Sequence, residues 1–411
     1  MFGLGFSSGL PLTLTGQTLS AWMTDEHVDL KTIGAFSLVG LAYSFKWIWS
    51  CVFDRFSLPW LGRRRGWILL LQLGLAASIA AMGCVNPRTT PGMMVATAIL
   101  TALFSASLDV VVDAHRADLL SSAERAAGTA AYVMGYRTGI LLAGTLALIL
   151  ADLVRWSVVY WLIAGLMAMT TITAALAEEP TTTTTQDFQG SAPSASFFGI
   201  IARALHQLFA KKAAVFVLLF VVLYKFGDSY AAPLFTPFVL DHLGFSKTEL
   251  ALFNKAIGFG GTVLGAAAGA ALATRHGLAR MLVCFGILQA ATNLLFSALA
   301  VVGKSYGLFV AAIFIDNTAN SLGTAVFLAF LLTLTEKSVS ATQYALLTAL
   351  SSVGQRFFGW STGYVVASVG WAGFYATTAL LALPGLLLIP FVPIDEMQSQ
   401  ARKKEQAAHQ Y

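Results

Sequence analysis

Charge and cysteine are both scarce in this sequence. Only 11% of the 411 residues are charged, whereas 57% are hydrophobic. Because a soluble domain has about 25% charged residues, this composition excludes an ordinary soluble protein and indicates a membrane protein. The three cysteines, Cys51, Cys84 and Cys284, show no CxxC or His/Cys spacing. We therefore expect no disulfide framework, no metal site and no other cofactor.

Motifs of membrane enzymes and channels are also missing. The sequence contains no H-E-x-x-H and no GxxxxGK[ST], which bind catalytic zinc and nucleotide phosphates. No filter loop of the channel type is visible. The net charge of +5 follows from basic residues in loops, so it does not indicate nucleic-acid binding. A transporter without catalytic residues is the expected class.

Hydrophobic runs of bilayer-spanning length predict an all-α membrane protein with twelve transmembrane helices. The first six spans are expected at Phe2–Met23, Ile33–Phe53, Trp67–Cys84, Met93–Asp113, Ala126–Leu150 and Trp156–Ala177. The second six are expected at Ala213–Leu240, Glu249–Thr274, Met281–Val302, Tyr306–Thr335, Ala341–Val366 and Trp371–Val392. Contact with membrane lipid follows from this arrangement.

Basic residues in alternate loops set the orientation. With the amino terminus inside, the outer loops receive only Lys31, Arg88, Arg155, Lys247 and Lys304, and the inner loops receive the other loop cations. This excess inside predicts that both termini are cytoplasmic.

The expected domains are two six-helix bundles, residues 1–177 and 213–394, joined by a cytoplasmic linker at 178–212 and followed by a cytoplasmic tail at 395–411. The linker has a run of threonines followed by Gln, Gly, Ser and Pro, which cannot bury enough apolar surface to fold alone. From Phe197 to Lys212 apolar residues recur at helical spacing, which predicts an amphipathic helix on the inner membrane surface.

The two halves have similar residues in similar places, which predicts the major facilitator fold. Asp109 and Asp316 lie in the fourth and tenth spans, and Lys46 and Lys255 lie in the second and eighth. Two six-helix repeats joined by a long linker are typical of that architecture, whose site lies between the halves. Small residues at intervals of four, such as Gly261, Gly265 and Gly269, predict close helix contacts.

The loop D-R-F-S-L-P-W-L-G-R-R-R-G after the second span resembles the D-R-x-G-R-R/K motif of major facilitators, although extra residues separate its two parts. The resemblance implies that Asp54 pairs with a basic residue at an inner helix end, and by position Arg116 is that residue. We therefore expect Asp54 and Arg116 to form an inner gate.

Several runs are similar to those of the AmpG muropeptide permease family, and the similarity covers nearly the whole chain. They include G-F-S-S-G-L-P-L-T-L-T-G-Q-T-L-S-A-W-M, S-A-S-L-D-V-V-V-D-A, V-L-Y-K-F-G-D and S-A-T-Q-Y-A-L-L-T-A-L-S-S-V-G. The resemblance implies a proton-driven importer in the bacterial inner membrane. Its implied cargo is anhydromuropeptides (GlcNAc-1,6-anhydroMurNAc peptides), which move from periplasm to cytoplasm for cell-wall recycling, a flux linked in some bacteria to β-lactamase induction.

The charged residues inside the spans predict the kind of substrate. Cations outnumber anions there, so some cations remain to meet an anionic cargo even if Asp109 pairs with Lys46 or Arg137 and Asp228 pairs with Lys225. The candidate substrate-binding residues are Gln17, Lys46, Arg137, Tyr224, Lys225, Asn254, Lys255, Asn317, Asn320 and Arg356. The alternative is a related major facilitator that carries another anionic solute, such as a siderophore or an acyl-coenzyme A.

Acids inside the spans are the candidates for proton coupling. A carboxylate at membrane depth costs about 2.5 to 3.5 kcal/mol on insertion scales, so it usually meets a partner or serves transport. Asp109 lies deepest in the fourth span and matches the family's S-A-S-x-D motif, and Asp228 and Asp316 are the next candidates. We expect a monomer that binds protons and one muropeptide.

Overall fold

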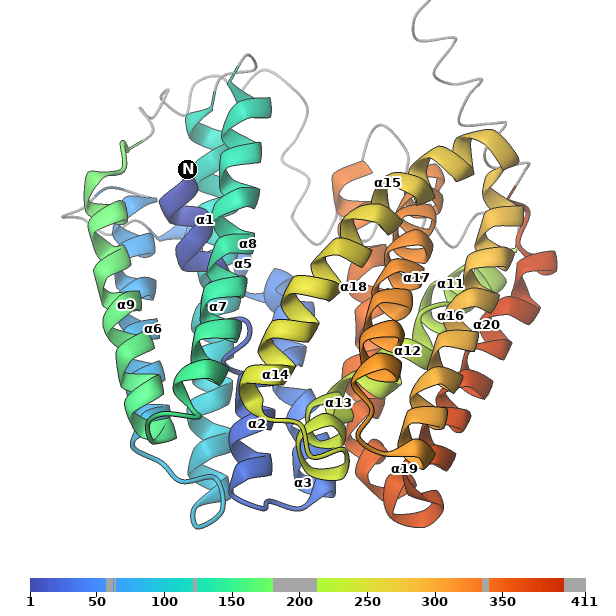
Figure 1. Cartoon of the computed structure of the whole chain (residues 1–411). Helices are drawn as coiled ribbons and strands as arrows, with labels where there is room; N and C mark the ends of the chain where they lie inside the picture. The colour runs from blue at the N-terminus through green and yellow to red at the C-terminus, as the bar shows by residue number, and fades with distance from the viewer. Residues whose placement is uncertain (57–61, 63, 121–123, 180–212, 335–339, 395–411) are drawn as a thin grey trace, which may run out of the picture. The chain divides into compact units, whose positions relative to one another are not determined.

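The computed structural model describes all residues except 57–61, 63, 121–123, 180–212, 335–339 and 395–411. The predicted linker helix and the carboxyl-terminal tail lie outside the described residues. Those that are described form helices and no β-strand (Figure 1). Eight stretches among them are long and apolar enough to cross a membrane, as expected of an all-α membrane protein.

The described residues fall into two compact units. Unit 1 comprises Met1–Gln189 together with Pro233–Leu252, and unit 2 comprises Gly190–Ala232 together with Phe253–Tyr411. The segment Pro233–Leu252 follows unit 2 residues in the chain but packs with unit 1. The domain boundaries expected from the linker therefore differ from this spatial division at one short segment.

Four long helices dominate unit 1: α6 (Arg65–Gly83), α7 (Pro91–Leu119), α8 (Arg125–Leu150) and α9 (Trp156–Leu176). Helix α6 packs against α7 and α9. Proline at the first position of α7 suits a helix start, because its missing N–H has no helical partner there. These helices match the expected third to sixth spans within a few residues.

The first two expected spans of unit 1 are divided into short helices, which corrects the prediction of continuous ones. Span one is α1 (Phe2–Gly9) and α2 (Gln17–Asp25). Span two is α3 (Leu30–Ala35), η1 (Phe36–Gly40), α4 (Leu41–Phe45), η2 (Lys46–Ile48) and α5 (Ser50–Arg55). Proline at position 11 and glycine at positions 16 and 40 weaken the helix where these breaks occur.

Helix α3 begins at a conventional N-cap. The Asp29 carboxylate accepts hydrogen bonds from the backbone N–H of Lys31 and Thr32 and from the Thr32 hydroxyl. The bond from the Thr32 hydroxyl, with smaller contributions from the two N–H groups, holds the pKa of Asp29 below its ordinary value.

Helices α1 and α8 of unit 1 touch backbone to backbone. A Cβ added at Gly5 or Gly9 of α1 would collide with a carbonyl oxygen of α8, and one added at Gly135 would collide with the Phe2 carbonyl oxygen of α1. Only glycine permits this approach.

Unit 2 is built on α15 (Gly258–His276), α16 (Leu278–Val302), α17 (Tyr306–Thr333), α18 (Ser340–Phe358) and α19 (Thr362–Leu381). Helix α17 packs against α15 and α16, and α16 packs against α19. Glycines at 261, 265 and 269 lie against the α17 backbone, as their spacing predicts. Its apolar core includes Phe220, Leu282, Phe330 and Leu347.

The other expected spans of the second half are also interrupted. Their pieces are α11 (Ala214–Leu223), α12 (Phe226–Ala231), η3 (Ala232–Leu234), α13 (Phe235–Pro237), η4 (Phe238–His242), α14 (Lys247–Leu252), η5 (Phe253–Ile257), η6 (Gly359–Ser361), α20 (Leu383–Leu388) and η7 (Ile389–Phe391). Gly370 has φ +71° and kinks α19 between the eleventh and twelfth expected spans. Such breaks let polar groups face the interior of a membrane protein.

Candidate functional site

Unit 1 holds an ion pair between Lys46, whose side chain is 35% exposed, and the buried Asp109. The Lys46 Nζ lies 3.7 Å from the Asp109 Oδ2, and the Asp109 side chain is only 10% exposed. The Asp109 Oδ1 is buried and has no hydrogen-bond partner among the described residues. Lys46 reaches this point because the second span is broken there, at the junction of α4 and η2. Of the two partners expected from the sequence, the structure pairs Asp109 with Lys46.

One turn along α7, Asp113 and Arg116 form a second pair. The Arg116 Nη2 lies 3.2 Å from the Asp113 Oδ1, and the Arg116 guanidinium lies 4.5 Å from the ring centre of Tyr132 on α8. The side chain of Asp54 is outside the described residues, so the gate of Asp54 with Arg116 stays a prediction.

A polar cluster at the start of α6 was not predicted from the sequence. The Glu179 carboxylate accepts hydrogen bonds from the backbone N–H groups of Arg64 and Arg65, each at 2.9 Å. The Arg64 Nε lies 2.8 Å from the Asp118 Oδ2 at the end of α7, and the Arg65 guanidinium donates to the Ala175 carbonyl oxygen. The signal for this cluster was an acid directly after the sixth span, because carboxylates favour helix amino termini.

In unit 2 the expected pair of Lys225 with Asp228 is not formed. The Lys225 Nζ donates to Asn320 on α17, at 2.7 Å to its Oδ1 and 3.1 Å to its carbonyl oxygen. The Asp228 Oδ1 accepts from the Asn293 Nδ2 at 2.9 Å, and the Asp316 Oδ1 accepts from the Thr292 hydroxyl at 2.8 Å. The three charged residues are therefore held by neutral polar side chains.

Other predicted substrate-binding residues have mixed surroundings. Tyr224 is 4% exposed, stacks on Phe327 and donates to the Leu282 carbonyl oxygen, so its hydroxyl serves the core of unit 2. Asn317 donates within its own helix to the Ile313 carbonyl oxygen.

The remaining predicted substrate-binding residues are exposed or half-buried, or their side chains are outside the described residues. Arg137 is exposed on α8, while Gln17, Asn254 and Arg356 are half-buried. The side chain of Lys255 is outside the described residues. Among the predicted substrate-binding residues, Lys46, Lys225 and Asn320 thus make polar contacts with other candidate site residues.

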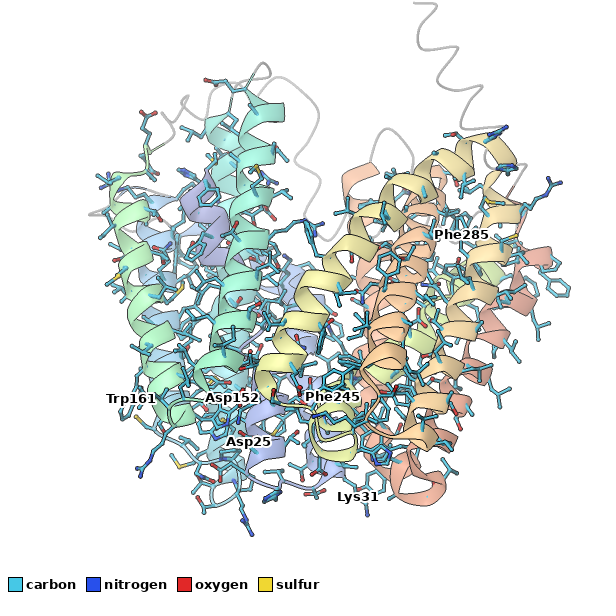
Figure 2. All side chains as sticks on the ribbon, viewed as in Figure 1. Asp25, Lys31, Asp152, Trp161, Phe245 and Phe285 are labelled. Atoms are coloured by element: carbon cyan, nitrogen blue, oxygen red, sulfur yellow. The ribbon has the colours of Figure 1, made fainter. Side chains whose placement is uncertain are left out.

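A further network lies at the end of unit 1 where α14 begins. The Lys247 Nζ lies 2.6 Å from the Asp25 Oδ2 and 3.4 Å from the Asp152 Oδ1. The backbone N–H and hydroxyl of Thr248 donate to the Asp152 Oδ2 at 2.9 and 2.6 Å, and the Trp156 Nε1 donates to Asp25 at 2.8 Å. Figure 2 labels Asp25 and Asp152 at this end. A cavity of about 890 Å³ adjoins it, lined by both acids.

Removing this lysine is expected to loosen α14 from the rest of unit 1. Lys247→Met would leave Asp25 and Asp152 facing each other without a cation, with a loss on the order of 1 kcal/mol for a partly exposed network. The reporter is Cys84, which lines the cavity: with Cys51 and Cys284 replaced by serine, its maleimide labelling should accelerate. The control is Lys31→Met, a change at an exposed lysine in the first turn of α3. Equal labelling rates in both variants would contradict a holding role for Lys247.

The spacing G-x-S-x-G of nucleophilic serines occurs twice, at Gly359 to Gly363 and at Gly5 to Gly9. In the first of these, Ser361 ends the short helix η6, and its hydroxyl donates to the Phe358 carbonyl oxygen and lies 2.6 Å from the Tyr230 hydroxyl. The other lies near the start of the chain. Its Ser7 lies inside α1, where its hydroxyl donates to the Leu4 carbonyl oxygen and accepts from the Gln72 amide. A nucleophile elbow needs a sharp turn between a strand and a helix, so this serine is a packing residue. Within the described residues no cluster of His, Cys, Asp or Glu suits a metal ion.

Two solved structures of transporters have a fold similar to that of this chain. The nucleoside transporter NupG has a TM-score of 0.72 at 16% identity, covering 94% of this chain and 97% of that chain. The POT family transporter PepTSo has a TM-score of 0.71 at 12% identity, covering 98% of each chain. The sequence also matches the family model of the Major Facilitator Superfamily over residues 1–253 and 217–410. Because this model matches more than half of the chain, the protein belongs to the Major Facilitator Superfamily.

Curated relatives narrow the class. The anhydromuropeptide permease of Escherichia coli (strain K12) is 45% identical over 387 residues, which is 94% of this chain and 77% of the relative. The putative transporter AmpG 4 of Rickettsia conorii is 30% identical over 397 residues, covering 95% of both. The chain therefore belongs to the AmpG muropeptide permease family of the major facilitator superfamily, and the resemblance seen in its sequence motifs is confirmed.

Proposed function

We propose that the protein imports anhydromuropeptides from the periplasm into the cytoplasm by proton-driven alternating access. The observation that supports the substrate is the 45% identity, over 94% of this chain, to a relative that is named for this cargo. The protein would reside in the bacterial inner membrane as a monomer, with both termini in the cytoplasm, and would need no cofactor.

The ion pair of Lys46 with the buried Asp109 supports the coupling mechanism. In the low dielectric of the membrane interior an ionised carboxylate is stable only while a cation compensates it. A proton on Asp109 would remove its attraction for Lys46, and the ammonium would become available to a carboxylate of the substrate. Proton binding and substrate binding would then be linked through one charge.

The interior cations support an anionic, sugar-bearing cargo. Arg137 is exposed on α8 and offers a planar group with two parallel donors, which suits a peptide carboxylate. Lys225 presents its charge beside Asn320, which is itself exposed and has an amide for sugar hydroxyls. A muropeptide has both kinds of group.

Uptake into energised vesicles tests the proposal directly. The vesicles are right-side-out inner-membrane vesicles, so that their outer face corresponds to the periplasmic face of the cell membrane. They carry the protein in the membrane, and labelled anhydromuropeptide is added outside them. We expect the labelled anhydromuropeptide to accumulate inside the vesicles. This accumulation should be lost when an uncoupler is added, and excess unlabelled anhydromuropeptide should inhibit it. Absence of labelled muropeptide uptake, together with uncoupler-sensitive uptake of a labelled siderophore or acyl-coenzyme A, would instead assign the transporter to another anionic solute.

A further inference from the structure

The ammonium of Lys225 in unit 2 is held by a neutral side chain. Its Nζ donates to the Asn320 Oδ1 at 2.7 Å and to the Asn320 carbonyl oxygen at 3.1 Å. None of the ion pairs formed by described residues includes Lys225, and the two acids that attract it, Asp228 and Asp316, accept hydrogen bonds from side chains of α16 instead. Lys225 and Asn320 both lie in stretches that can cross a membrane. Because a charge at membrane depth usually meets a partner or a transported solute, this ammonium is available to an anionic ligand.

The backbone fixes Lys225 at the junction of α11 and α12. Lys225 is the N-cap residue of α12, and its φ of −99° and ψ of 6° place it outside the regular helix. The preceding residue, Tyr224, stacks on Phe327 of α17 and donates to the Leu282 carbonyl oxygen. Phe327 and Asn320 are seven residues apart, which places them on one face of α17. Two consecutive residues of the junction therefore contact this face, and Lys225 is held beside Asn320.

The contact with Lys225 also fixes the orientation of the Asn320 amide. An ammonium has donors and no acceptor, so the amide atom that lies 2.7 Å from it is the oxygen. The Thr324 hydroxyl shares its hydrogen between the Asn320 carbonyl oxygen, at 2.7 Å, and the same Oδ1, at 3.2 Å. Neither neighbour uses the hydrogens of the Asn320 Nδ2, and no other described residue accepts them. Both amide hydrogens are therefore available to a ligand.

The free donors of Lys225 and Asn320 lie close together. Standard C=O and C–N lengths place the oxygen and nitrogen of one amide about 2.3 Å apart, and the Lys225 Nζ lies 2.7 Å from this oxygen. The Nζ and the Asn320 Nδ2 are therefore at most about 5 Å apart. Lys225 uses two of its three N–H groups on Asn320, so one remains. Because Asn320 is exposed and Lys225 is half-buried, a ligand can reach these donors.

We propose that Lys225 and Asn320 form a carboxylate subsite of unit 2. One oxygen of the ligand carboxylate accepts from the Lys225 ammonium, and the other accepts from the Asn320 amide. The two oxygens of a carboxylate can bridge donors at this spacing, and the positive charge strengthens the contact. The second amide hydrogen remains for a neighbouring ligand oxygen, such as a sugar hydroxyl. That the carboxylate belongs to the peptide of an anhydromuropeptide rests on the proposed function, whereas recognition of a carboxylate does not.

Competition binding to the purified protein tests the subsite without transport. Labelled anhydromuropeptide bound to the detergent-extracted protein is displaced by unlabelled anhydromuropeptide in two forms. One form has free peptide carboxyl groups, and in the other form these groups are converted to amides. The wild type should bind the amidated form about tenfold more weakly, because hydrogen bonds to a charged acceptor are lost.

Asn320→Asp assigns this preference for the free acid to the subsite. Aspartate has nearly the same size and keeps an oxygen for Lys225, but it replaces the amide donors with a second acceptor and a negative charge. The preference should therefore fall about tenfold, whereas Asn320→Ala, which keeps the Lys225 charge, should lose less of it. The control is Asn86→Asp, because the Asn86 Oδ1 accepts from the backbone N–H groups of Arg88 and Thr89, and aspartate can also accept there. This control should keep the wild-type preference.

The outcomes separate this inference from the proposed function. Equal affinities of the wild type for the two forms, or an unchanged preference in Asn320→Asp, would overturn the subsite even if vesicles accumulate muropeptide. A preference that is lost in Asn320→Asp and kept in Asn86→Asp would support the subsite even if vesicles show no accumulation, which would contradict only the proposed import. Absence of any muropeptide binding to the wild type would contradict both.

Discussion

Gly135→Val is expected to abolish the folded protein. A Cβ at this position would collide with the Phe2 carbonyl oxygen and would also approach the Phe6 backbone nitrogen, at 2.9 Å. Backbone atoms cannot rotate away as a side chain can, so α1 and α8 would have to separate along their whole contact. Overpacking in a fitted core costs about 1 to 3 kcal/mol, and here the loss should exceed that range because two helices must move.

The control for this prediction is Gly165→Val on α9. An added Cβ there meets nothing within 4 Å, and the position is exposed. Detergent-extracted Gly165→Val should elute as a single peak in size-exclusion chromatography, with a melting temperature near that of the wild type, whereas Gly135→Val should aggregate. If the Gly135→Val variant is monodisperse and has the melting temperature of the wild type, the contact between α1 and α8 can accommodate a larger side chain, and the prediction is wrong.

This helix contact shows what the sequence could predict. The spacing of glycines at 135 and 139, as at 261, 265 and 269, follows from the helical period, which places residues four apart on one face. Long apolar runs likewise predicted α6 to α9, α16 and α17 within a few residues. Both predictions depend on local periodicity, which the sequence records directly.

The interrupted spans could not be predicted in the same way. Hydropathy measures apolarity and responds weakly to a change of backbone direction, so Lys46 was expected inside a continuous helix. In the structure it begins η2, a short 3-10 helix. Proline at 237 gave a local signal for the π-helix η4 that follows, but the combined effect of several weak breakers depends on packing.

Neutral polar residues are the second kind of feature that the sequence did not single out. Thr292 and Asn293 are ordinary residues in an apolar run, and only the fold shows that they face acids from two other helices. The position of Lys247 is similar: its partners Asp25 and Asp152 lie far away in the chain. Such contacts depend on the tertiary arrangement, which no periodicity records.

Asp109→Asn is expected to abolish proton-driven accumulation while leaving insertion and folding intact. Asparagine keeps the shape of the side chain but fixes the neutral state, so Lys46 loses the charge that lies 3.7 Å away. Because the protonation step is removed, the variant should still exchange substrate across the membrane but should not accumulate it against a concentration gradient. Vesicles preloaded with unlabelled anhydromuropeptide would measure exchange, and energised empty vesicles would measure accumulation.

Two further variants make the test of Asp109 specific. Lys46→Met should also abolish accumulation, because an Asp109 without its cation would stay neutral, and the double variant Asp109→Asn/Lys46→Met should lose coupling no further than either single one. Asp29→Asn is the control, since an asparagine N-cap still accepts from the α3 backbone, and it should accumulate normally. If Asp109→Asn still accumulates muropeptide and still loses it on addition of an uncoupler, the coupled proton does not bind at Asp109, and the acids of unit 2 would remain as its carriers.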